Sequence, residues 1–218
     1  MGYNFATQPL QGFYGVGLAV STQLKVLECQ FVPFPTTRQG RGILYARTEK
    51  FLFVTTHLES FEVTSQYTGV EEREAQIQEA SRFCQEQLNR YPEIDMAVIA
   101  GDFNWDDERK QKSKSPNQNL LTLLKDGWND AGKSNDHTYD GKENQMLTNR
   151  LRRRLDRCIY MTNKNVQLKQ VSLEKLGKDP IPNLIWSKKN PYNGTTKQVS
   201  VLPSDHFGIG VQFQTKRG

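Results

Sequence analysis

The sequence has few cysteines and no long apolar run, and both features limit what the protein can be. Its three cysteines, Cys29, Cys84 and Cys158, are widely separated and form no CxxC spacing, so neither a zinc knuckle nor a disulfide framework is indicated. A reducing compartment is the simplest interpretation. No stretch approaches the roughly 18 apolar residues of a membrane span. Residues 1–10 have neither the basic start nor the apolar core of a signal peptide, so we expect no membrane partner.

Internal repeats, low-complexity tracts and a phosphate-cradling P-loop are also absent from the sequence. The length of 218 residues allows one large domain or two small ones. Only 36% of the residues are hydrophobic, but 11 Phe, 8 Tyr and 3 Trp supply bulky core material. The formal net charge is +5 and the pI is near 9.0, which favours a polyanionic partner.

The most informative stretch is 96–107, Met-Ala-Val-Ile-Ala-Gly-Asp-Phe-Asn-Trp-Asp-Asp. The short apolar run over 96–100 predicts a strand buried on both faces, and Gly101 allows the backbone to turn at its end. Asp102 and Asn104 then follow at a spacing of two, so their side chains point the same way if the chain stays extended. A carboxylate beside an amide can position a water and hold a phosphate oxygen. The alternative is an ordinary polar turn, because Gly, Asp and Asn are common turn residues.

Apolar patterning divides the rest of the chain mostly into strands. The spacing of Ile77, Ala80, Cys84 and Leu88 predicts one long helix over 71–91, followed by the 96–100 strand in a right-handed β-α-β crossover. Prolines predict connections over 32–39 and 179–194. Further elements are a short helix over 119–125 and strands over 12–20, 23–31, 42–47, 51–56, 155–161, 166–173 and 208–213. The pattern predicts an α/β (α+β) fold in which helices cover the outer faces of two packed sheets, a four-layer α/β/β/α sandwich.

Several polar residues lie at the predicted strand ends, where sites form in layered folds. They are His57, Asp102 with Asn104, Asp156, and Asp205 with His206. Their chemistry suits phosphodiester hydrolysis: one carboxylate ligates a hard divalent cation, another activates water, and imidazoles stabilise charge on phosphorus. Each residue also has a simpler interpretation. A histidine at a strand end is usually a surface residue, and Asp156 could form a salt bridge with Arg154 or Arg157.

Four motifs, taken together, resemble a known superfamily. They are Thr-His-Leu-Glu-Ser over 56–60, Gly-Asp-Phe-Asn over 101–104, Arg-Leu-Asp-Arg over 154–157 and Pro-Ser-Asp-His-Phe-Gly over 203–208. They resemble the endonuclease/exonuclease/phosphatase superfamily, which has a deoxyribonuclease-I-like fold. The first motif, with residues 32–36 and 138–140, is most similar to the tyrosyl-DNA phosphodiesterase 2 branch. The resemblance runs from about residue 12 to residue 211.

The resemblance implies an activity. Members of this branch hydrolyse, with Mg²⁺ (Mn²⁺ is the alternative cofactor), the bond between a tyrosine and a 5′ phosphate of DNA. They release topoisomerase II remnants from DNA, and protein-linked RNA is a second substrate in the branch. We therefore expect a monomeric DNA-repair hydrolase over 1–218, in the nucleus or also in the cytoplasm.

Roles carry over by motif. Asp205 would be the metal ligand and His206 a transition-state stabiliser oriented by Asp156. Asp102 and Asn104 would handle the attacking water and the phosphate. The residues expected to bind or support the substrate are His57, Ser60, Tyr139 and Arg154.

The sequence also departs from the family. The family's site includes an upstream Thr-Trp-Asn strand and a Leu-Gln-Glu strand, whose glutamate is a principal metal ligand, and neither motif occurs here. Mg²⁺ is usually held by only one or two carboxylates, so such a loss should weaken its binding severely. We expect an N-terminally truncated domain. The alternatives are a catalytically inactive DNA-binding relative, or another nuclease or phosphatase of the same fold.

Basic residues flank the expected site. Arg150, Arg152, Arg153, Arg154 and Arg157 precede or follow Asp156, and Lys110, Lys112 and Lys114 follow Asn104. Both groups could contact DNA phosphates, or they could form a solvated face.

Overall fold

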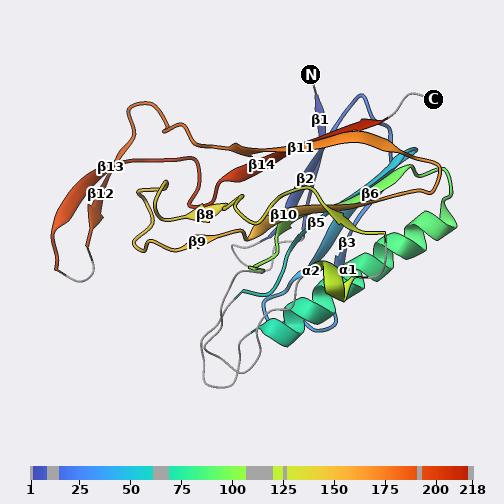
Figure 1. The fold of residues 1–218 in the computed structure, drawn as a ribbon, viewed down its shortest axis with the longest axis horizontal. Coiled ribbons are helices and arrows are strands. Elements are labelled where there is room, and N and C mark those ends of the chain that lie inside the picture. The colour runs from blue at the N-terminus through green and yellow to red at the C-terminus, as the bar shows by residue number, and fades with distance from the viewer. Residues whose placement is uncertain are drawn as a thin grey trace.

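The centre of the fold is a mixed sheet of six strands (Figure 1). The structure, a computed structural model, describes residues 2–8, 15–60, 69–106, 120–124, 127–190 and 193–215. Across the sheet the order is β3 (Val26–Pro33), β4 (Gly42–Thr48), β5 (Phe51–His57), β6 (Met96–Asp102), β10 (Asp156–Thr162) and β7 (Asn129–Asp130). Only the β5–β6 pair is parallel among these neighbours.

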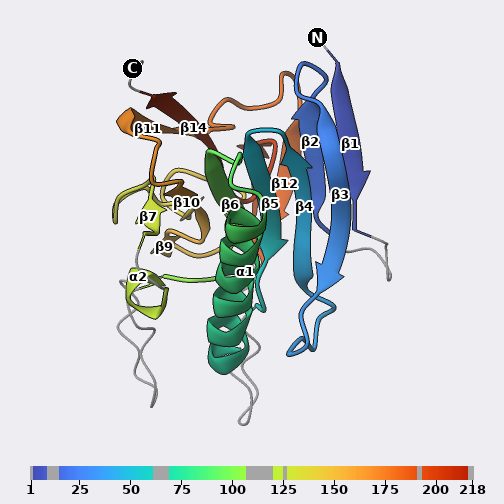
Figure 2. The ribbon, with the colours of Figure 1, turned by 90° about the vertical axis from the view of Figure 1, so that its right-hand side faces the viewer.

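The parallel pair is joined by the long helix α1 (Val70–Arg90), which confirms the predicted β-α-β unit. Its Ile77, Ala80 and Cys84 side chains are completely buried against one face of the sheet, with Leu52 and Ile99. Burying an isoleucine side chain contributes about 1.5–3 kcal/mol relative to leaving it exposed. The short helix α2 (Leu120–Leu123) lies on the same face (Figure 2). None of the described helices is long and apolar enough to cross a membrane.

The opposite face of the central sheet packs against a second, two-stranded sheet, β11 (Leu168–Leu176) with β14 (Gly208–Thr215). Val98 and Cys158 of the central sheet meet Val211 and Phe213 there, beside an apolar cavity of about 680 Å³. The described residues thus form three successive layers, helix, sheet and sheet, and contain no helix over the outer face of β11–β14.

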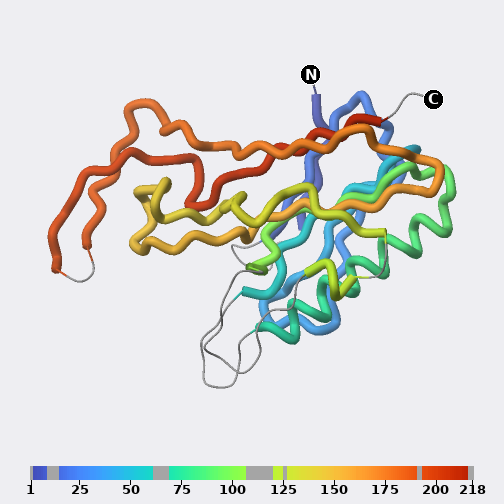
Figure 3. The backbone as a smooth tube through the Cα atoms, viewed as in Figure 1, coloured from blue at the N-terminus to red at the C-terminus, as the bar shows by residue number. Residues whose placement is uncertain are grey.

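Three further pairs of strands complete the described sheets. They are β1 (Tyr3–Thr7) with β2 (Gly17–Ser21), β8 (Tyr139–Asp140) with β9 (Arg152–Arg153), and β12 (Ile185–Lys189) with β13 (Thr196–Ser200). The tube in Figure 3 shows that β12–β13 extends away from the two packed sheets.

Several expected boundaries change. The predicted connection over 179–194 is wrong, because β12 lies within it and is stabilised by pairing with β13. The connection predicted over 32–39 is wrong at its start, since β3 continues to Pro33; a proline is tolerated at the end of an edge strand. The first predicted strand, 12–20, is replaced by Gly17–Ser21, and residues 12–14 lie outside the described residues.

Candidate active site

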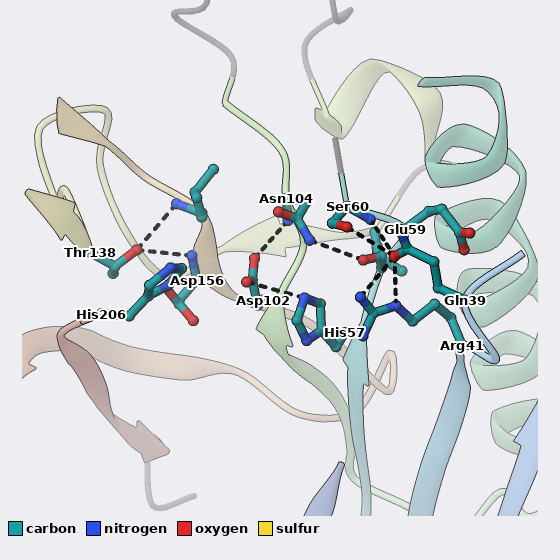
Figure 4. A network of polar contacts seen from close by, with 12 residues as sticks. Gln39, Arg41, His57, Glu59, Ser60, Asp102, Asn104, Thr138, Asp156 and His206 are labelled. Carbon is teal, nitrogen blue, oxygen red and sulfur yellow. Dashed lines mark hydrogen bonds and ion pairs between the residues drawn. The ribbon is translucent and has the colours of Figure 1, made fainter. Parts of the chain in front are cut away.

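Three adjacent strands of the central sheet bring three predicted site residues to one edge. His57 ends β5 and is in register with Asp102, which ends the parallel strand β6. Asp156 begins the antiparallel strand β10 and is in register with Asp102 on its other side. Figure 4 shows His57 and Asp102 between the Asp156–His206 pair and a second polar group that includes Arg41. The sheet register therefore assembles the cluster.

The turn after β6 fixes Asp102 and Asn104 in a way that differs from the extended chain considered from the sequence. Gly101 has a φ of 148°, and a Cβ there would lie 1.9 Å from the carbonyl oxygen of Thr56, so only glycine fits. Asn104 has a left-handed φ of 48°. Its backbone N–H donates to Asp102 Oδ1 at 2.8 Å, and its Nδ2 donates to the carbonyl of Leu58 at 3.0 Å. The two side chains are thus held by a turn and not by strand alternation.

His206 reaches this edge from the loop before β14. Its Nδ1 lies 2.7 Å from Asp156 Oδ2, the contact predicted for an orienting carboxylate. Two residues that the sequence did not assign hold this pair. Thr138 Oγ1 accepts hydrogen bonds from the N–H groups of Leu155 and Asp156, at 3.1 and 3.0 Å. Completely buried Asn144 donates through Nδ2 to the carbonyls of the two residues before His206, at 3.0 and 3.1 Å.

Thr138 lay in the 138–140 motif, but that motif carried no hint of its two hydrogen bonds. Asn144 had no signal in the sequence beyond a polar loop. Both act on the site by holding backbone, which residue type alone does not reveal.

Burial and neighbouring charges shift three pKa values in this cluster. Burial, together with the charge of Asp156, raises the pKa of Asp102 from 3.8 to about 6. Burial, together with the Arg41 charge, lowers the pKa of His57 to about 4, so its contact with Asp102 at 3.4 Å is made by a neutral imidazole at neutral pH. Burial alone would lower the pKa of His206, but the hydrogen bond and charge of Asp156 raise it. The site therefore pairs a neutral and a protonatable histidine.

A second polar group lies on the far side of His57. Ser60 donates to Gln39 Oε1 through both its backbone N–H and its Oγ, at 3.0 Å each. Arg41 donates to the same oxygen through Nε and Nη2, at 3.2 and 2.8 Å. A polar cavity of about 310 Å³ is lined in part by Arg38, Arg41 and His57. Cationic and imidazole groups around one cavity suit an anionic ligand.

The buried carboxylate of Glu59 anchors the 56–60 motif. Its side chain is completely buried and accepts hydrogen bonds from Thr37 Oγ1, the Arg38 backbone N–H and Gln76 Nε2, at 3.0, 2.9 and 2.9 Å. Gln76 belongs to α1, so this residue ties the end of β5 to the helix. The buried carboxylate of Glu59 therefore stabilises the fold at this point.

One group of described residues could hold a metal ion: Asp102, Asp156 and His206 offer ligand atoms that all lie within 4.8 Å of one another. Two carboxylates suit a hard cation, and the pKa of Asp102 is raised by burial and then by the charge of Asp156, a repulsion that a cation would offset. Asp205, the expected metal ligand, is exposed and lies outside this group.

Of the residues expected to bind substrate, Tyr139 lies at the cluster and Arg154 does not. The Tyr139 ring packs edge-on against His206, with centroids 5.3 Å apart. Arg154 is only 5% exposed, and its guanidinium forms an ion pair with Asp130. Arg157 also pairs with Asp130, at 3.2 Å.

The basic group around Asp156 is therefore partly structural. Arg152 pairs with Asp140 at 2.9 Å, whereas Arg150 is exposed. Lys110, Lys112 and Lys114 lie outside the described residues.

Comparison with known proteins was made by sequence and by structure. No family model and no curated protein matches the sequence. Solved structures do match. TDP2 (tyrosyl-DNA phosphodiesterase 2) from C. elegans superposes with a TM-score of 0.73 and 20% identity, covering 98% of this chain and 58% of that chain. A D. rerio TDP2 complexed with single-strand DNA product gives 0.65 and 23%, covering 95% and 75%.

A third match, sphingomyelinase C from Streptomyces griseocarneus, has a TM-score of 0.62 and 16% identity, covering 92% of this chain and 68% of that chain. The predicted resemblance is thereby confirmed for the fold: the chain has the deoxyribonuclease-I-like α+β fold of TDP2 and of sphingomyelinases. It spans 58% of the length of the C. elegans TDP2 structure.

Proposed function

We propose that this chain is a divalent-metal-dependent phosphodiesterase that hydrolyses the bond between a tyrosine and a 5′ phosphate of DNA. The observation that carries the proposal is the cluster of Asp102, Asp156 and His206, within 4.8 Å at one sheet edge beside His57. The likeness in fold to TDP2, including a structure with single-strand DNA product, supports DNA as the substrate. The basic pI of about 9.0 is consistent with a polyanion.

Asp102 is the proposed general base. Its pKa of about 6 makes it a stronger base than an ordinary aspartate, and it is still largely ionised near neutral pH. The backbone N–H of Asn104 occupies Oδ1, so Oδ2, which also contacts His57 Nε2 at 3.4 Å, is the oxygen that accepts a proton from water. The second N–H of the Asn104 amide can donate to a phosphate oxygen, since the first is bonded to Leu58.

The two histidines act on the phosphate from opposite sides of Asp102. His206, with its pKa raised by Asp156, is the cationic donor to the charge that develops on the phosphoryl oxygens. Neutral His57 contributes a hydrogen bond without adding charge. Tyr139, packed against His206, limits how that ring can rotate.

A divalent cation, when bound, would offset negative charge on the phosphate. The carboxylate of Asp156 is the described group placed to hold it, with the base Asp102 next to it, and Asp205 is the ligand proposed from the sequence. These assignments are separable by titrating Mg²⁺. Asp205→Asn should raise the Mg²⁺ concentration needed for half-maximal activity if Asp205 is a ligand, and should leave it unchanged if Asp156 suffices.

The decisive experiment is single-turnover cleavage of a 5′-phosphotyrosyl oligonucleotide by the full chain, with Mg²⁺ or with chelator. His206→Ala should abolish cleavage. His137→Ala is the matched control, because its imidazole makes no side-chain hydrogen bond with the described residues, and it should retain activity. A folded chain that leaves this substrate intact but cleaves sphingomyelin, an abasic-site DNA or another phosphoester would refute the tyrosyl-DNA assignment. No cleavage of any of them would indicate an inactive relative.

A further inference from the structure

The hairpin β12–β13 carries aromatic and basic side chains on one face. In its register Trp186 lies opposite Val199, and Lys188 lies opposite Lys197. Because side chains alternate along a strand, these four residues share one face of the hairpin. Val199 is buried, at 3% exposure, whereas 44% of Trp186 remains exposed. This face of the hairpin is therefore packed against the protein at Val199 and open to solvent at Trp186.

A groove of about 420 Å³ separates this face from the loop over residues 141–150. Three cationic side chains line it: Arg150 from the loop, and Lys188 and Lys197 from the hairpin. The Lys188 ammonium donates to two backbone carbonyls of the loop, one of them at 2.7 Å, and so holds the hairpin against it. The groove is thus formed by side chains that link two elements of the fold.

The groove begins close to the candidate active site. Asn149 lines it and donates through Nδ2 to the Tyr139 hydroxyl at 2.8 Å. The ring of Tyr139 in turn packs against His206. A polymer with one phosphate at His206 can therefore reach the groove with its next few units.

The charges of the groove lack acidic partners. Arg150 and Lys197 form no ion pair with any of the described residues, and both are exposed. Like charges directly opposite each other on neighbouring strands, as in Lys188 and Lys197, destabilise a hairpin unless an anion lies between them. The nearby carboxylate of Glu143 is already paired with Lys175 at 2.8 Å.

We infer that this face binds the single-stranded nucleic acid that leads away from the scissile bond, with phosphates along Arg150 and Lys197 and a base stacked on Trp186. A basic groove beside an exposed aromatic ring is the usual arrangement for sequence-tolerant binding of single strands. The inference rests on the proposed function in its choice of a nucleic acid.

A membrane surface is the competing occupant, because Ile185 and Trp186 are exposed. These two residues lie at the base of the hairpin, and the groove beside them is lined by the cationic side chains of Arg150, Lys188 and Lys197. The observations favour the nucleic acid.

The test is the binding of a fluorescent oligothymidylate without a 5′ tyrosine, measured by anisotropy over a range of salt in the presence of chelator. Single-strand binding has a salt slope of roughly 0.7 per phosphate contact, so Arg150→Ala with Lys197→Ala should lower the slope by about 1.4. The matched control replaces two exposed lysines at the far end of the sheets, Lys164→Ala with Lys169→Ala, and should leave it unchanged.

Trp186→Ala should weaken binding about 5-fold or more, and Trp186→Phe should restore most of it, since either aromatic ring can stack on a base. Equal slopes for the two double variants, together with unchanged affinity in Trp186→Ala, would overturn the inference. So would co-sedimentation with phosphatidylserine vesicles that is lost in Trp186→Ala while oligonucleotide binding persists.

Binding in chelator does not depend on turnover, so the two proposals can fail separately. If the variants change oligonucleotide binding as expected but the chain cleaves no phosphotyrosyl substrate, the proposed function alone is refuted. If the chain cleaves the phosphotyrosyl substrate but the variants leave oligonucleotide binding unchanged, this inference alone is refuted.

Discussion

Replacing Asp102 by asparagine is expected to stabilise the chain at alkaline pH while removing its activity. The folded state raises the pKa of this carboxyl from 3.8 to about 6, because the side chain is buried and Asp156 is beside it. Between these two pH values the folded state binds more protons than the unfolded state, so stability falls as pH rises through that window. Above it, the ionised carboxylate is a constant cost to folding.

The size of this cost follows from the shift. About two pH units at 1.36 kcal/mol each correspond to about 3 kcal/mol, an upper figure for a side chain that is 17% exposed. The asparagine keeps an oxygen to accept the N–H of Asn104, so the turn is retained. We expect Asp102→Asn to raise the free energy of unfolding by as much as about 3 kcal/mol near pH 8, and by little near pH 4.

Urea unfolding in chelator at the two pH values measures this difference. Asp179→Asn, at an exposed position, is the matched control and should change neither value. With Mg²⁺ in place of the chelator, cleavage of the phosphotyrosyl oligonucleotide by the same variant should fall by about 10²–10⁴. A variant that gains the same stability at both pH values, or none, would contradict the claim that ionised Asp102 is strained by its surroundings.

Three further outcomes are expected. Asp156→Asn should leave folding nearly intact but reduce turnover. Because the charge of Asp156 raises the pKa of His206, activity that depends on protonated His206 should be lost at a lower pH in this variant than in the wild type. An unshifted pH profile would count against the orienting role of Asp156. Thr138→Val should cost about 1–3 kcal/mol of stability and reduce activity, because it leaves the buried N–H of Leu155 and the partly buried N–H of Asp156 without their acceptor. Thr138→Ser should restore both stability and activity, as measured by urea unfolding and turnover. Glu59→Ala should lower stability by at least about 1–3 kcal/mol, while the exposed Glu49→Ala should not, and equal denaturation midpoints for the two would refute the anchoring role.

The strands of the central sheet could be predicted because their signal is local. Short β-branched or aromatic runs over 51–56 and 96–100 bury most of their side chains wherever the sheet forms, so the sequence carries their identity. The helix over 71–91 was predicted within a residue at each end for the same reason, a repeating apolar stripe. The strand β12 was missed, since its side chains are mostly exposed and only pairing with β13 makes it a strand.

The candidate site could be predicted in its residue types but not in its connections. The motifs identified the residues at strand ends, and the resemblance assigned their roles. The sequence did not predict the left-handed turn at Asn104, the two hydrogen bonds of Thr138 or the ion pair between Arg154 and Asp130. Each depends on a partner distant in sequence or on a backbone angle that residue type leaves open.

The sequence by itself determined which segments are apolar enough to be buried and which chemical groups stand at their ends. Those properties belong to single residues and to short-range order. Only the tertiary structure decided which groups meet, because the parallel register of β5 with β6 and the antiparallel register of β6 with β10 bring His57, Asp102 and Asp156 to one edge. Moving either strand by one residue would turn its side chain to the other face of the sheet and separate the cluster.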